Sequence, residues 1–396
     1  MTAFALTADQ QAFAAQVREM ASSRLLPLVA AGQPGSVNRE LVKTMGSLGL
    51  LRRLFPGLSG EAQSRSRSGG SPDGGSLSRE AAATDLCLLR ESLATVTTEA
   101  ETALALQGLG SYPILQSGRD ELVRHWLPAV AAGDAVAAFA LTEPSAGTDA
   151  AALTLAAEPD GDGWRLTGSK MWISNAPEAD FYTVFARTTA DAGARGVSAF
   201  VVPADRPGLT GAHLDMLSPH PIGSLTFDGV PVHAGELLGE VDRGFGVAMR
   251  ALNLFRPSVG AFAVGMATAA LDASVEHAGR RVAFGGPLKD QQAVSHLLAE
   301  MATRVSAARL LVYAAAAAYD AGEERIAGRA AMAKLFATET AQFVVDSAVQ
   351  IHGALALRRG HLLEHLYREV RAPRIYEGTS EIQRTVIARE LFRTGG

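Results

Sequence analysis

The segment FYTVFARTTADAGARGVSAFVVPA, residues 181–204, decides the fold class of this chain. It contains two short apolar runs, FYTVFAR and VSAFVVPA, separated by polar residues and glycines. Runs of this length, rich in Val, Phe and Tyr and bounded by turn residues, are typical of β-strands. The apolar runs WRLTG and SLTF and the turn signals EPDGDG, RPG and FDG surround it. Residues 136–240 are therefore predicted to form an antiparallel β-domain, either a sheet or a small barrel.

Residues 1–135, before this domain, carry the 3.6-residue apolar period of α-helices. Phe13, Val17 and Met20 fall on one helical face, and the letters TADQ just before them match a capping box. The stretch from Ser59 to Ser78, rich in Ser, Gly and Arg, interrupts the pattern and is predicted to be an exposed, mobile loop. The start of the chain has no basic region and no cleavage-site pattern, so no signal peptide is predicted.

Residues 241–396, after the β-domain, return to the helical period in four segments. We predict that these segments form a four-helix bundle. The fold class is thus α+β and mostly α, with an N-terminal helical domain, a middle barrel-like β-domain and a C-terminal bundle. The apolar positions that define the four helices are Phe245, Met249, Leu252 and Val259, then Val294, Leu298, Met301, Val305 and Val312, then Leu335, Phe336, Phe343 and Val344, and lastly the stretch HLLEHLYREV.

The composition is that of a globular protein. The chain has 396 residues, of which 47% are hydrophobic and 19% are charged, and this balance excludes a disordered chain. The net charge of −5 argues against a nucleic-acid-binding protein. No charge-free apolar run reaches the roughly 20 residues that a membrane span needs. Cys87 is the single cysteine, so no internal disulfide can form, and a cytoplasmic location is predicted.

Two stretches of the β-domain combine groups that suit a ligand. FALTEPSAGTDAAAL, residues 139–153, can offer backbone N–H groups and hydroxyl donors to a phosphate or a carbonyl-rich molecule. In GSKMWISNA, residues 168–176, period two places Trp172 and Ser174 on one strand face, which suits a planar heterocycle. The alternative is a plain loop and a strand with Trp172 in the core. The sequence contains neither a dinucleotide-binding GxGxxG nor a P-loop.

The sequence HLLEH, His361–His365, matches the HxxEH signature of inverted zinc peptidases. Its two histidines at i and i+4 would share a helix face beside Glu364, and such a pair can bind Zn²⁺. The alternative is the polar face of an amphipathic helix whose leucines face the core. No third ligand is marked, so we predict no metal and keep a zinc hydrolase as an alternative function.

The segment RIYEGTSEIQ, Arg374–Gln383, places one carboxylate, Glu377, just before a predicted helix. Ser380 and Gln383 match a capping box, and the helix dipole stabilises a nearby acid by about 0.3–1 kcal/mol. The dipole lowers the pKa of such an acid, whereas burial raises it towards the value that suits a base near neutral pH. From these residues a structural role and a catalytic role both stay open.

Five motifs occur in order along the chain: FALTEPSAGTD, KMWIS, RRVAFGGPLKDQQ, VQIHG and RIYEGTSEIQ. With them the chain closely resembles the acyl-CoA dehydrogenase family of flavoproteins over nearly its whole length, most weakly from about 53 to 110. The resemblance implies the helical, β and four-helix architecture described above. It also implies FAD as the cofactor and a homotetramer, or else a homodimer.

The reaction that the resemblance implies is the α,β-dehydrogenation of an acyl-CoA thioester to the trans-2-enoyl-CoA. Glu377 would be the base for the α-proton, the β-hydrogen would leave as hydride to flavin N5, and an electron-transfer flavoprotein would accept the electrons. Some family members carry the base on an earlier helix, where this chain has Phe255. The alternatives are an acyl group presented on a carrier protein, a flavin oxidase, and a flavin-binding scaffold without catalysis.

The resemblance also implies the residues that bind substrate and cofactor. Arg256 lies on an apolar helix stripe, needs a polar partner if it is buried, and matches an arginine near the substrate. Thr148 and Gly378 would also face the substrate, and the glycine leaves room for the acyl group. Arg281, Phe284 and Gln292 resemble the set that grips the cofactor of a neighbouring subunit, and Gln350 and Gly353 match the stretch that closes that site. Thr379 and Glu381 follow the base. The implied cofactor residues are Phe139, Leu141, Thr142, Trp172, Ser174, Arg281, Phe284, Gln292, Gln350, Gly353, Thr379 and Glu381.

Overall fold

The computed structural model of the chain describes residues 6–55 and 82–393. The chain divides into two compact units, each assembled from separate parts of the sequence. Unit 1 consists of Met1–Leu26, Ala83–Glu101 and Asn253–Gly396, and unit 2 consists of Pro27–Ala82 and Thr102–Leu252. The predicted loop from Ser59 to Ser78 lies outside the described residues.

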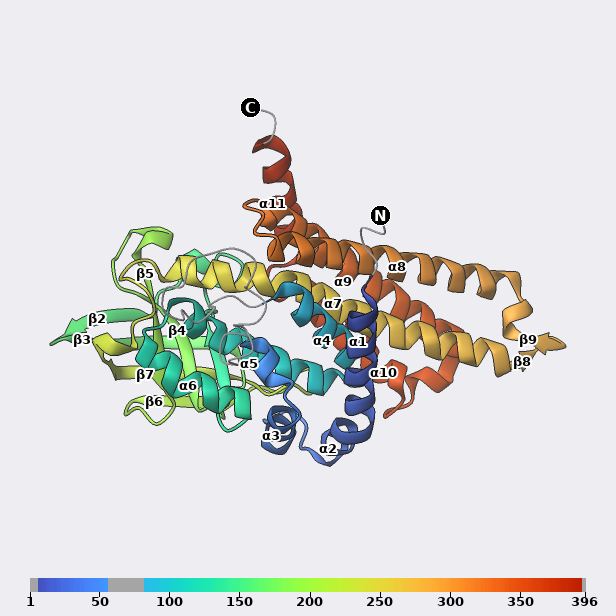
Figure 1. The fold of residues 1–396 in the computed structure, drawn as a ribbon, viewed down its shortest axis with the longest axis horizontal. Coiled ribbons are helices and arrows are strands. Elements are labelled where there is room, and N and C mark those ends of the chain that lie inside the picture. Colours follow the sequence, from blue (N-terminus) through green and yellow to red (C-terminus); the bar gives the residue numbers. More distant parts are fainter. Residues whose placement is uncertain (1–5, 56–81, 394–396) are drawn as a thin grey trace. The chain divides into compact units, whose positions relative to one another are not determined.

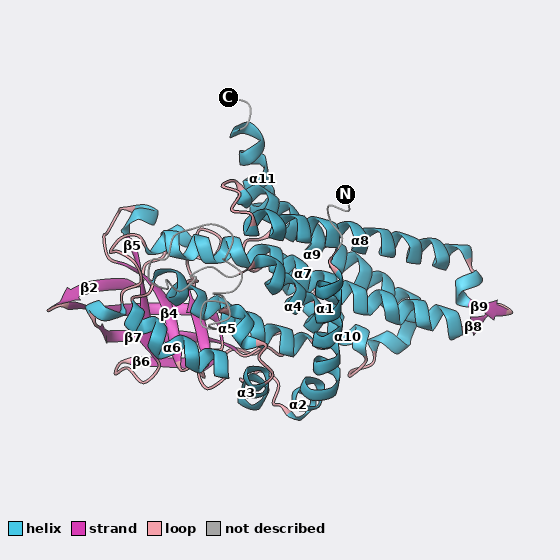
Figure 2. Ribbon diagram, viewed as in Figure 1, coloured by secondary structure: helices cyan, strands magenta, loops and turns pink. Residues whose placement is uncertain are grey.

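Unit 2 contains the β-domain predicted from the sequence (Figure 2). Its strands are β1 (Ala137–Ala140), β2 (Ala156–Asp160), β3 (Gly163–Ser174), β4 (Phe181–Arg187), β5 (Val197–Pro203), β6 (Leu209–His213) and β7 (Ile222–Val232). The longer helices with residues in this unit are α2 (Leu26–Ala31), α3 (Arg39–Ser47), α5 (Thr98–Ser117) and α6 (Asp120–Ala132). Short helical turns are η2 (Leu51–Leu54), η5 (Ala150–Ala152), η6 (Gly193–Gly196) and η7 (Ala234–Glu236).

The seven strands form one sheet that curls into a half-barrel. Their spatial order is β1, β4, β2, β3, β7, β6, and β5 pairs with β4. The pairs β2–β3, β3–β7, β4–β5 and β6–β7 are antiparallel, as predicted, but β1 and β2 run parallel to β4. The sheet is therefore mostly antiparallel, as predicted, with two parallel pairings that the sequence did not indicate. Long connections separate β1 and β2 from β4 along the chain, and these supply the crossovers that parallel strands need.

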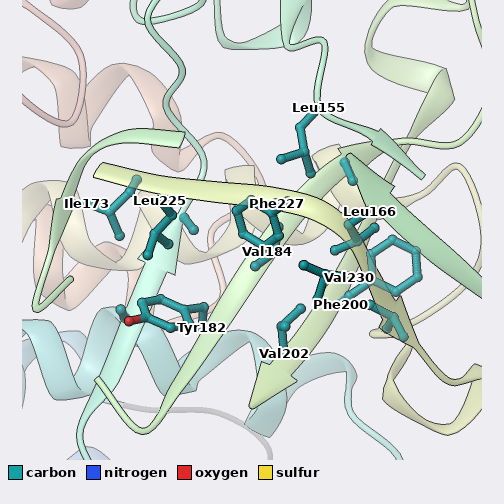
Figure 3. Packing of buried hydrophobic residues seen from close by; sticks show 14 of the residues in the cluster. Leu155, Leu166, Ile173, Tyr182, Val184, Phe200, Val202, Leu225, Phe227 and Val230 are labelled. Carbon is teal, nitrogen blue, oxygen red and sulfur yellow. The ribbon is translucent and has the colours of Figure 1, made fainter. Parts of the chain in front are cut away.

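The core of the half-barrel consists of alternate residues from most of its strands (Figure 3). Period two explains this choice, because every second side chain of a strand points to the same face. The side chains that Figure 3 labels in this cluster are Leu155, Leu166, Ile173, Tyr182, Val184, Phe200, Val202, Leu225, Phe227 and Val230.

Strand β4 is buried on both faces, which explains its unbroken apolar run. Tyr182 belongs to the core just described. Phe181 packs against Trp126 of α6, with ring centroids 4.4 Å apart, and Thr183 Oγ1 donates a 2.7 Å hydrogen bond to the carbonyl of Gly110 in α5. Helices α5 and α6 therefore cover the second face of this strand, and neither face is exposed to solvent.

Unit 1 is helical apart from one small hairpin (Figure 1). Its helices are α1 (Ala8–Met20), α4 (Ala83–Ala94), α7 (Gly244–Arg280), α8 (Gln292–Asp320), α9 (Ile326–His352), α10 (Leu362–Glu369) and α11 (Ser380–Arg393). The turns η1 (Ala21–Leu25), η8 (Leu288–Asp290), η9 (Gly353–Leu357) and η10 (Ala372–Arg374) connect them, and β8 (Val282–Ala283) pairs with β9 (Gly286–Pro287). Helix α7 begins in unit 2, and α5 begins in unit 1.

Helix α9 is central to unit 1, because it packs against α8, α10 and α11. Two glycines let α7 approach its neighbours closely. A Cβ added at Gly260 would lie 2.7 Å from Val312 Cγ2 of α8, and one at Gly265 would lie 2.6 Å from Ala94 Cβ of α4. All four predicted C-terminal helices are present, and the predicted fold class is confirmed: mostly helical, with a β-domain in the middle.

Two smaller expectations can be compared with the helices. Thr7 Oγ1 accepts from the N–H of Gln10, whose side chain accepts from the N–H of Thr7, so the predicted capping box at the start of α1 is confirmed. Among residues 6–55 and 82–393, one helix, α7, is long and apolar enough to cross a membrane. Since 72% of its most apolar window is buried inside the protein, it has the environment of a core helix.

Candidate active site

The turn between η10 and α11 has an unusual backbone. Glu377 has a φ of 52°, in the left-handed region that residues with a Cβ rarely adopt, and Gly378 follows with a φ of 93°. Such a conformation costs free energy and persists only where the surroundings hold it. Strained residues of this kind cluster at functional sites, so the turn is a candidate before any chemistry is considered.

Side chains from three helices bind the two carbonyl groups of this turn. The amide nitrogen of Gln383, in α11, donates to the carbonyls of Glu377 (3.1 Å) and Gly378 (2.9 Å). Arg256 Nε of α7 lies 3.4 Å from the Glu377 carbonyl oxygen, and Lys334 Nζ of α9 lies 2.7 Å from that of Gly378. The backbone of the turn is therefore held in its strained form by one amide and two cations.

The predicted capping box of Ser380 and Gln383 is wrong. Thr379 Oγ1 accepts the hydrogen bond from the N–H of Ile382 at the start of α11, over 3.3 Å. Ser380 Oγ instead donates to Glu339, and Gln383 is occupied with the turn carbonyls. Sequence spacing could not distinguish these partners, because Thr379 and Ser380 are adjacent and both belong to the preferred capping residues.

The Glu377 carboxylate has the environment that a base requires. Its Oε2 atom is buried and, among the described parts of the chain, finds no hydrogen-bond partner. Burial raises the pKa of Glu377 above its ordinary value, and the positive charges of Arg90, Lys334 and Arg256 offset only part of that effect. The sequence left open whether the helix dipole would lower this pKa or burial would raise it, and in the structure the effect of burial is the larger. The carboxylate therefore holds a proton more readily than an ordinary glutamate does, which is the direction of pKa shift that suits a general base.

Arg256 has the polar partners that its burial requires. The residue is only 9% exposed, and it donates to Asn253 Oδ1 over 3.2 Å as well as to the Glu377 carbonyl. Burial lowers the pKa of the Arg256 guanidinium, and the Glu377 carboxylate counteracts this. The predicted need of Arg256 for a polar partner is thus confirmed, and the structure places Arg256 beside the backbone of Glu377. Its contact with the substrate stays a prediction.

Three buried charges near Glu377 escaped the sequence analysis. Arg90 of α4 forms an ion pair with Glu101 of α5, and its NH1 donates to Ser258 Oγ of α7 over 2.8 Å. Lys334 is completely buried in α9. Two of them had a signal in the sequence: Arg90 directly follows the apolar run LCLL, and Lys334 interrupts the apolar stretch AAMAKLFA. A charge that a core helix buries must find a partner.

The other candidate region lies in unit 2, along the end of β3. Trp172 has a φ of 61°, and the pairing of β3 with β7 shifts register between Lys170 and Ile173. This irregularity leaves Trp172 52% exposed while Ile173 is buried. The alternative that placed Trp172 in the core is therefore wrong. Ser174, two residues further, is half-buried.

The loop that follows β1 is fixed to the same end of β3. Phe139 ends up half-buried in β1, with its ring centroid 4.9 Å from that of Phe185. Leu141 is buried, and the carbonyl of Thr142 accepts a 3.0 Å hydrogen bond from the N–H of Met171. Leu141, Thr142 and Trp172 therefore belong to one local structure. Thr148 lies further along the loop and is exposed.

The remaining cofactor candidates lie in unit 1. Arg281 adjoins the hairpin β8–β9, Phe284 occupies its bend, and Gln292 begins α8; all three are exposed. Phe284 has a φ of 52° and is 93% exposed. Gln350 and Gly353 lie exposed at the end of α9. Thr379 directly precedes α11, and Glu381 lies in its first turn.

The comparisons with known proteins identify the family. Models of the N-terminal, middle and C-terminal domains of acyl-CoA dehydrogenases match residues 7–134, 138–230 and 242–392. The chain belongs to the acyl-CoA dehydrogenase family. Acyl-CoA dehydrogenases are FAD-dependent oxidoreductases, in agreement with the enzyme class and the cofactor predicted from the sequence.

Similar acyl-CoA dehydrogenases and structures cover almost the whole chain. Cyclohexane-1-carbonyl-CoA dehydrogenase of Geobacter metallireducens is 34% identical over 382 residues, 95% of this chain and 96% of the relative. The structure of butyryl-CoA dehydrogenase from Megasphaera elsdenii is 34% identical with a TM-score of 0.87, covering 98% of this chain and 100% of that chain. A chain in a structure described as the electron transferring flavoprotein of Acidaminococcus fermentans is also 34% identical, with a TM-score of 0.88 and coverage of 98% and 99%.

Membership of the acyl-CoA dehydrogenase family leaves no support for the zinc hydrolase alternative. His361 Nδ1 accepts from the N–H of Leu363 at the start of α10. Glu364 forms an ion pair with Arg368, and His365 Nε2 lies 2.6 Å from Thr98 Oγ1. Each polar side chain of the HLLEH motif thus has its own partner, as on a polar helix face.

Proposed function

We propose that this protein is an FAD-dependent acyl-CoA dehydrogenase in which Glu377 removes the α-proton of the acyl thioester. The observation that carries the proposal is the buried, unpartnered Oε2 of Glu377 on a strained turn. Burying such an atom without a partner costs free energy, so the fold gains nothing from it and a catalytic role explains its presence. A raised pKa is what a general base near neutral pH needs.

The residues of the β-domain fit a flavin. Trp172 exposes an indole at an irregular point of β3, two residues before the half-buried Ser174. The neighbouring Met171 N–H binds the carbonyl of Thr142 in the loop that follows β1. An exposed aromatic next to hydroxyl and backbone donors suits a planar, polar-edged ring. We propose that Phe139, Leu141, Thr142, Trp172 and Ser174 hold the flavin part of FAD. When bound there, FAD supplies an acceptor for the β-hydrogen as hydride.

The chain's own residues would handle the proton and the developing charge. Glu377 takes the α-proton, and its backbone N–H, as the family resemblance implies, helps to hold the thioester oxygen where negative charge develops. Gly378 carries no side chain that could collide with the acyl group, and Arg256 and Thr148 complete the proposed substrate contacts. Arg256 also binds the Glu377 carbonyl, so it couples substrate position to the base.

The proposal also covers the acyl group of the substrate and the electron acceptor. Relatives of equal identity are named for a cyclic acyl-CoA and for butyryl-CoA, so overall similarity does not select the acyl group. We propose a CoA thioester as substrate and an electron-transfer flavoprotein as acceptor. The exposed Phe284 would contact the cofactor of a neighbouring subunit in a homotetramer or homodimer, together with Arg281 and Gln292.

Anaerobic bleaching of the flavin by a panel of acyl-CoAs tests the proposal. We expect at least one acyl-CoA to bleach the wild-type protein, and the Glu377→Gln variant to retain FAD but lose bleaching. Glu364→Gln, which removes an acid of the HLLEH motif, is the control and should bleach normally. Undiminished bleaching by Glu377→Gln would sink the assignment of the base. Bleaching by acyl-carrier protein but by no acyl-CoA would show that the carrier is different.

A further inference from the structure

Lys334 is a buried lysine whose hydrogen bond goes to a backbone carbonyl. It lies in α9 and is fully buried, and its Nζ atom lies 2.7 Å from the carbonyl oxygen of Gly378. Removing an ammonium group from water costs several kcal/mol unless strong partners compensate. A methionine would fill similar space without that cost, so packing alone does not explain the lysine.

The charges around Lys334 converge on one turn. Burial lowers the pKa of Lys334 to about 8, against the attraction of Glu377, Glu339 and Glu381 and with a further lowering by Arg256. Glu339 is itself paired with Arg374 and bonded to Ser380, so it does not serve as the lysine's partner. Glu381 is exposed and pairs with Arg384. The Gly378 carbonyl and the nearby Glu377 carboxylate therefore remain for the ammonium to stabilise.

The same turn receives a second donor that binds both carbonyls. Gln383 donates to the oxygens of Glu377 and Gly378, which follow each other in the left-handed region. Two successive residues with positive φ would relax towards ordinary backbone angles if nothing held their carbonyls. Lys334 and Gln383 reach the turn from different helices, so together they fix its position in space as well as its conformation.

We propose that Lys334, acting with Gln383, is a positioning residue that holds the Glu377–Gly378 turn in its left-handed conformation and thereby sets the place of the Glu377 carboxylate. The inference rests on the proposed role of Glu377 as the base. It goes further, because it assigns catalytic consequence to a side chain that touches neither substrate nor cofactor in the proposal. The charge of Lys334 has a second effect, since it favours the ionised form of Glu377.

Three variants separate these effects in the full FAD-loaded enzyme. Lys334→Met removes donor and charge, Lys334→Gln keeps a neutral donor, and Lys334→Arg keeps both. The rate of anaerobic bleaching by the best acyl-CoA is followed against pH, with FAD content and near-ultraviolet circular dichroism as checks on the fold. Thr338→Val is the matched control: Thr338 is also buried in α9, one turn on, and its hydroxyl bonds only helix carbonyls.

For Lys334→Met we expect the acid limb of the bleaching rate to move up by on the order of one pH unit, because Glu377 has lost a stabilising charge. The plateau rate above that limb should fall about 10- to 100-fold, as the carboxylate leaves its place. Lys334→Gln should recover part of the plateau but keep the shifted limb. Lys334→Arg and Thr338→Val should keep the wild-type limb.

A wild-type limb and plateau in FAD-loaded Lys334→Met would overturn the inference, and so would an equal change in Thr338→Val. If Lys334→Met does not fold, Lys334→Gln replaces it in the comparison, and a wild-type limb together with a wild-type plateau in that variant overturns the inference. Glu377→Gln, measured beside them, distinguishes the two proposals. If it bleaches like wild type, the proposed base is wrong; if it does not bleach while the Lys334 variants behave as wild type, only the positioning role is wrong.

Discussion

Lys170 Nζ lies 2.8 Å from Glu143 Oε1, and both side chains are almost completely buried in the β-domain. The lysine also donates to the Leu141 carbonyl, and the carboxylate accepts from the backbone N–H groups of Thr154 and Leu155. Burial alone would raise the pKa of Glu143, but Lys170 and these hydrogen bonds bring it below its ordinary value. One ion pair therefore fastens both ends of the loop between β1 and β2 to β3.

Breaking this pair should destabilise the whole protein. In Glu143→Gln the Lys170 ammonium stays buried without a counter-charge, and we expect the free energy of unfolding to fall by about 3–5 kcal/mol. Urea denaturation followed by circular dichroism measures the loss. Glu158→Gln, an exposed acid on β2, is the control and should stay within about 0.5 kcal/mol of wild type. A loss below about 1 kcal/mol in Glu143→Gln would contradict the role given to the pair.

Removing the Glu377 charge should stabilise the fold. Because the folded-state pKa of Glu377 lies above its unfolded value, the folded protein binds more protons between those two values. Stability therefore falls as pH rises through that window, and the loss persists at higher pH. Glu377→Gln escapes it, so its melting temperature should exceed that of wild type at neutral pH, with the gap closing below the ordinary glutamate pKa. If the variant melts at or below the wild-type temperature at neutral pH, the buried carboxylate does not lower the stability of the fold.

Gly378→Ala should cost more activity than strain alone explains. A Cβ at Gly378 would lie 2.6 Å from Gln383 Nε2, at a φ of 93°. We expect a loss of about 1–2 kcal/mol of stability from the backbone, together with a large drop in bleaching rate. Gly360→Ala is the control, since Gly360 has a φ of 82° but nothing within 4 Å of an added Cβ. Equal bleaching rates in the two variants would show that the acyl group does not need the space beside Gly378.

Trp172→Ala should weaken the binding of FAD and leave the fold intact. The indole is half exposed, so its removal takes little from the core. If it stacks on the flavin, its loss should raise the dissociation constant of FAD about tenfold, as the worth of an aromatic contact suggests. Titration of the apoprotein with FAD measures this. Trp164→Ala, whose ring lies 5.2 Å from that of Phe200 beside the sheet core, should instead lower the melting temperature.

The sequence predicted what depends on period and composition, and it failed where tertiary partners decide. The strand β4 and the helices α7 to α10 follow from apolar spacing, and Arg256 needed a partner because it interrupts an apolar stripe. The sequence did not predict that Gln383 donates to the carbonyls of Glu377 and Gly378, because a capping box requires the same residue type at the same position. The sequence did not decide whether Trp172 lies in the core or at a ligand site, because the register shift that exposes it depends on how β3 pairs with β7.

The exposure of Trp172 also gives the protein a built-in optical reporter. The chain has three tryptophans, and Trp126 and Trp164 are both packed more deeply than Trp172. Solvent contact shifts indole emission to longer wavelengths, so the red part of the apoprotein spectrum belongs mainly to Trp172. A flavin laid over that ring would quench this part by energy transfer and leave the blue emission of the other two less affected. Occupancy of the β-domain could then be followed in real time, without a label and without turnover.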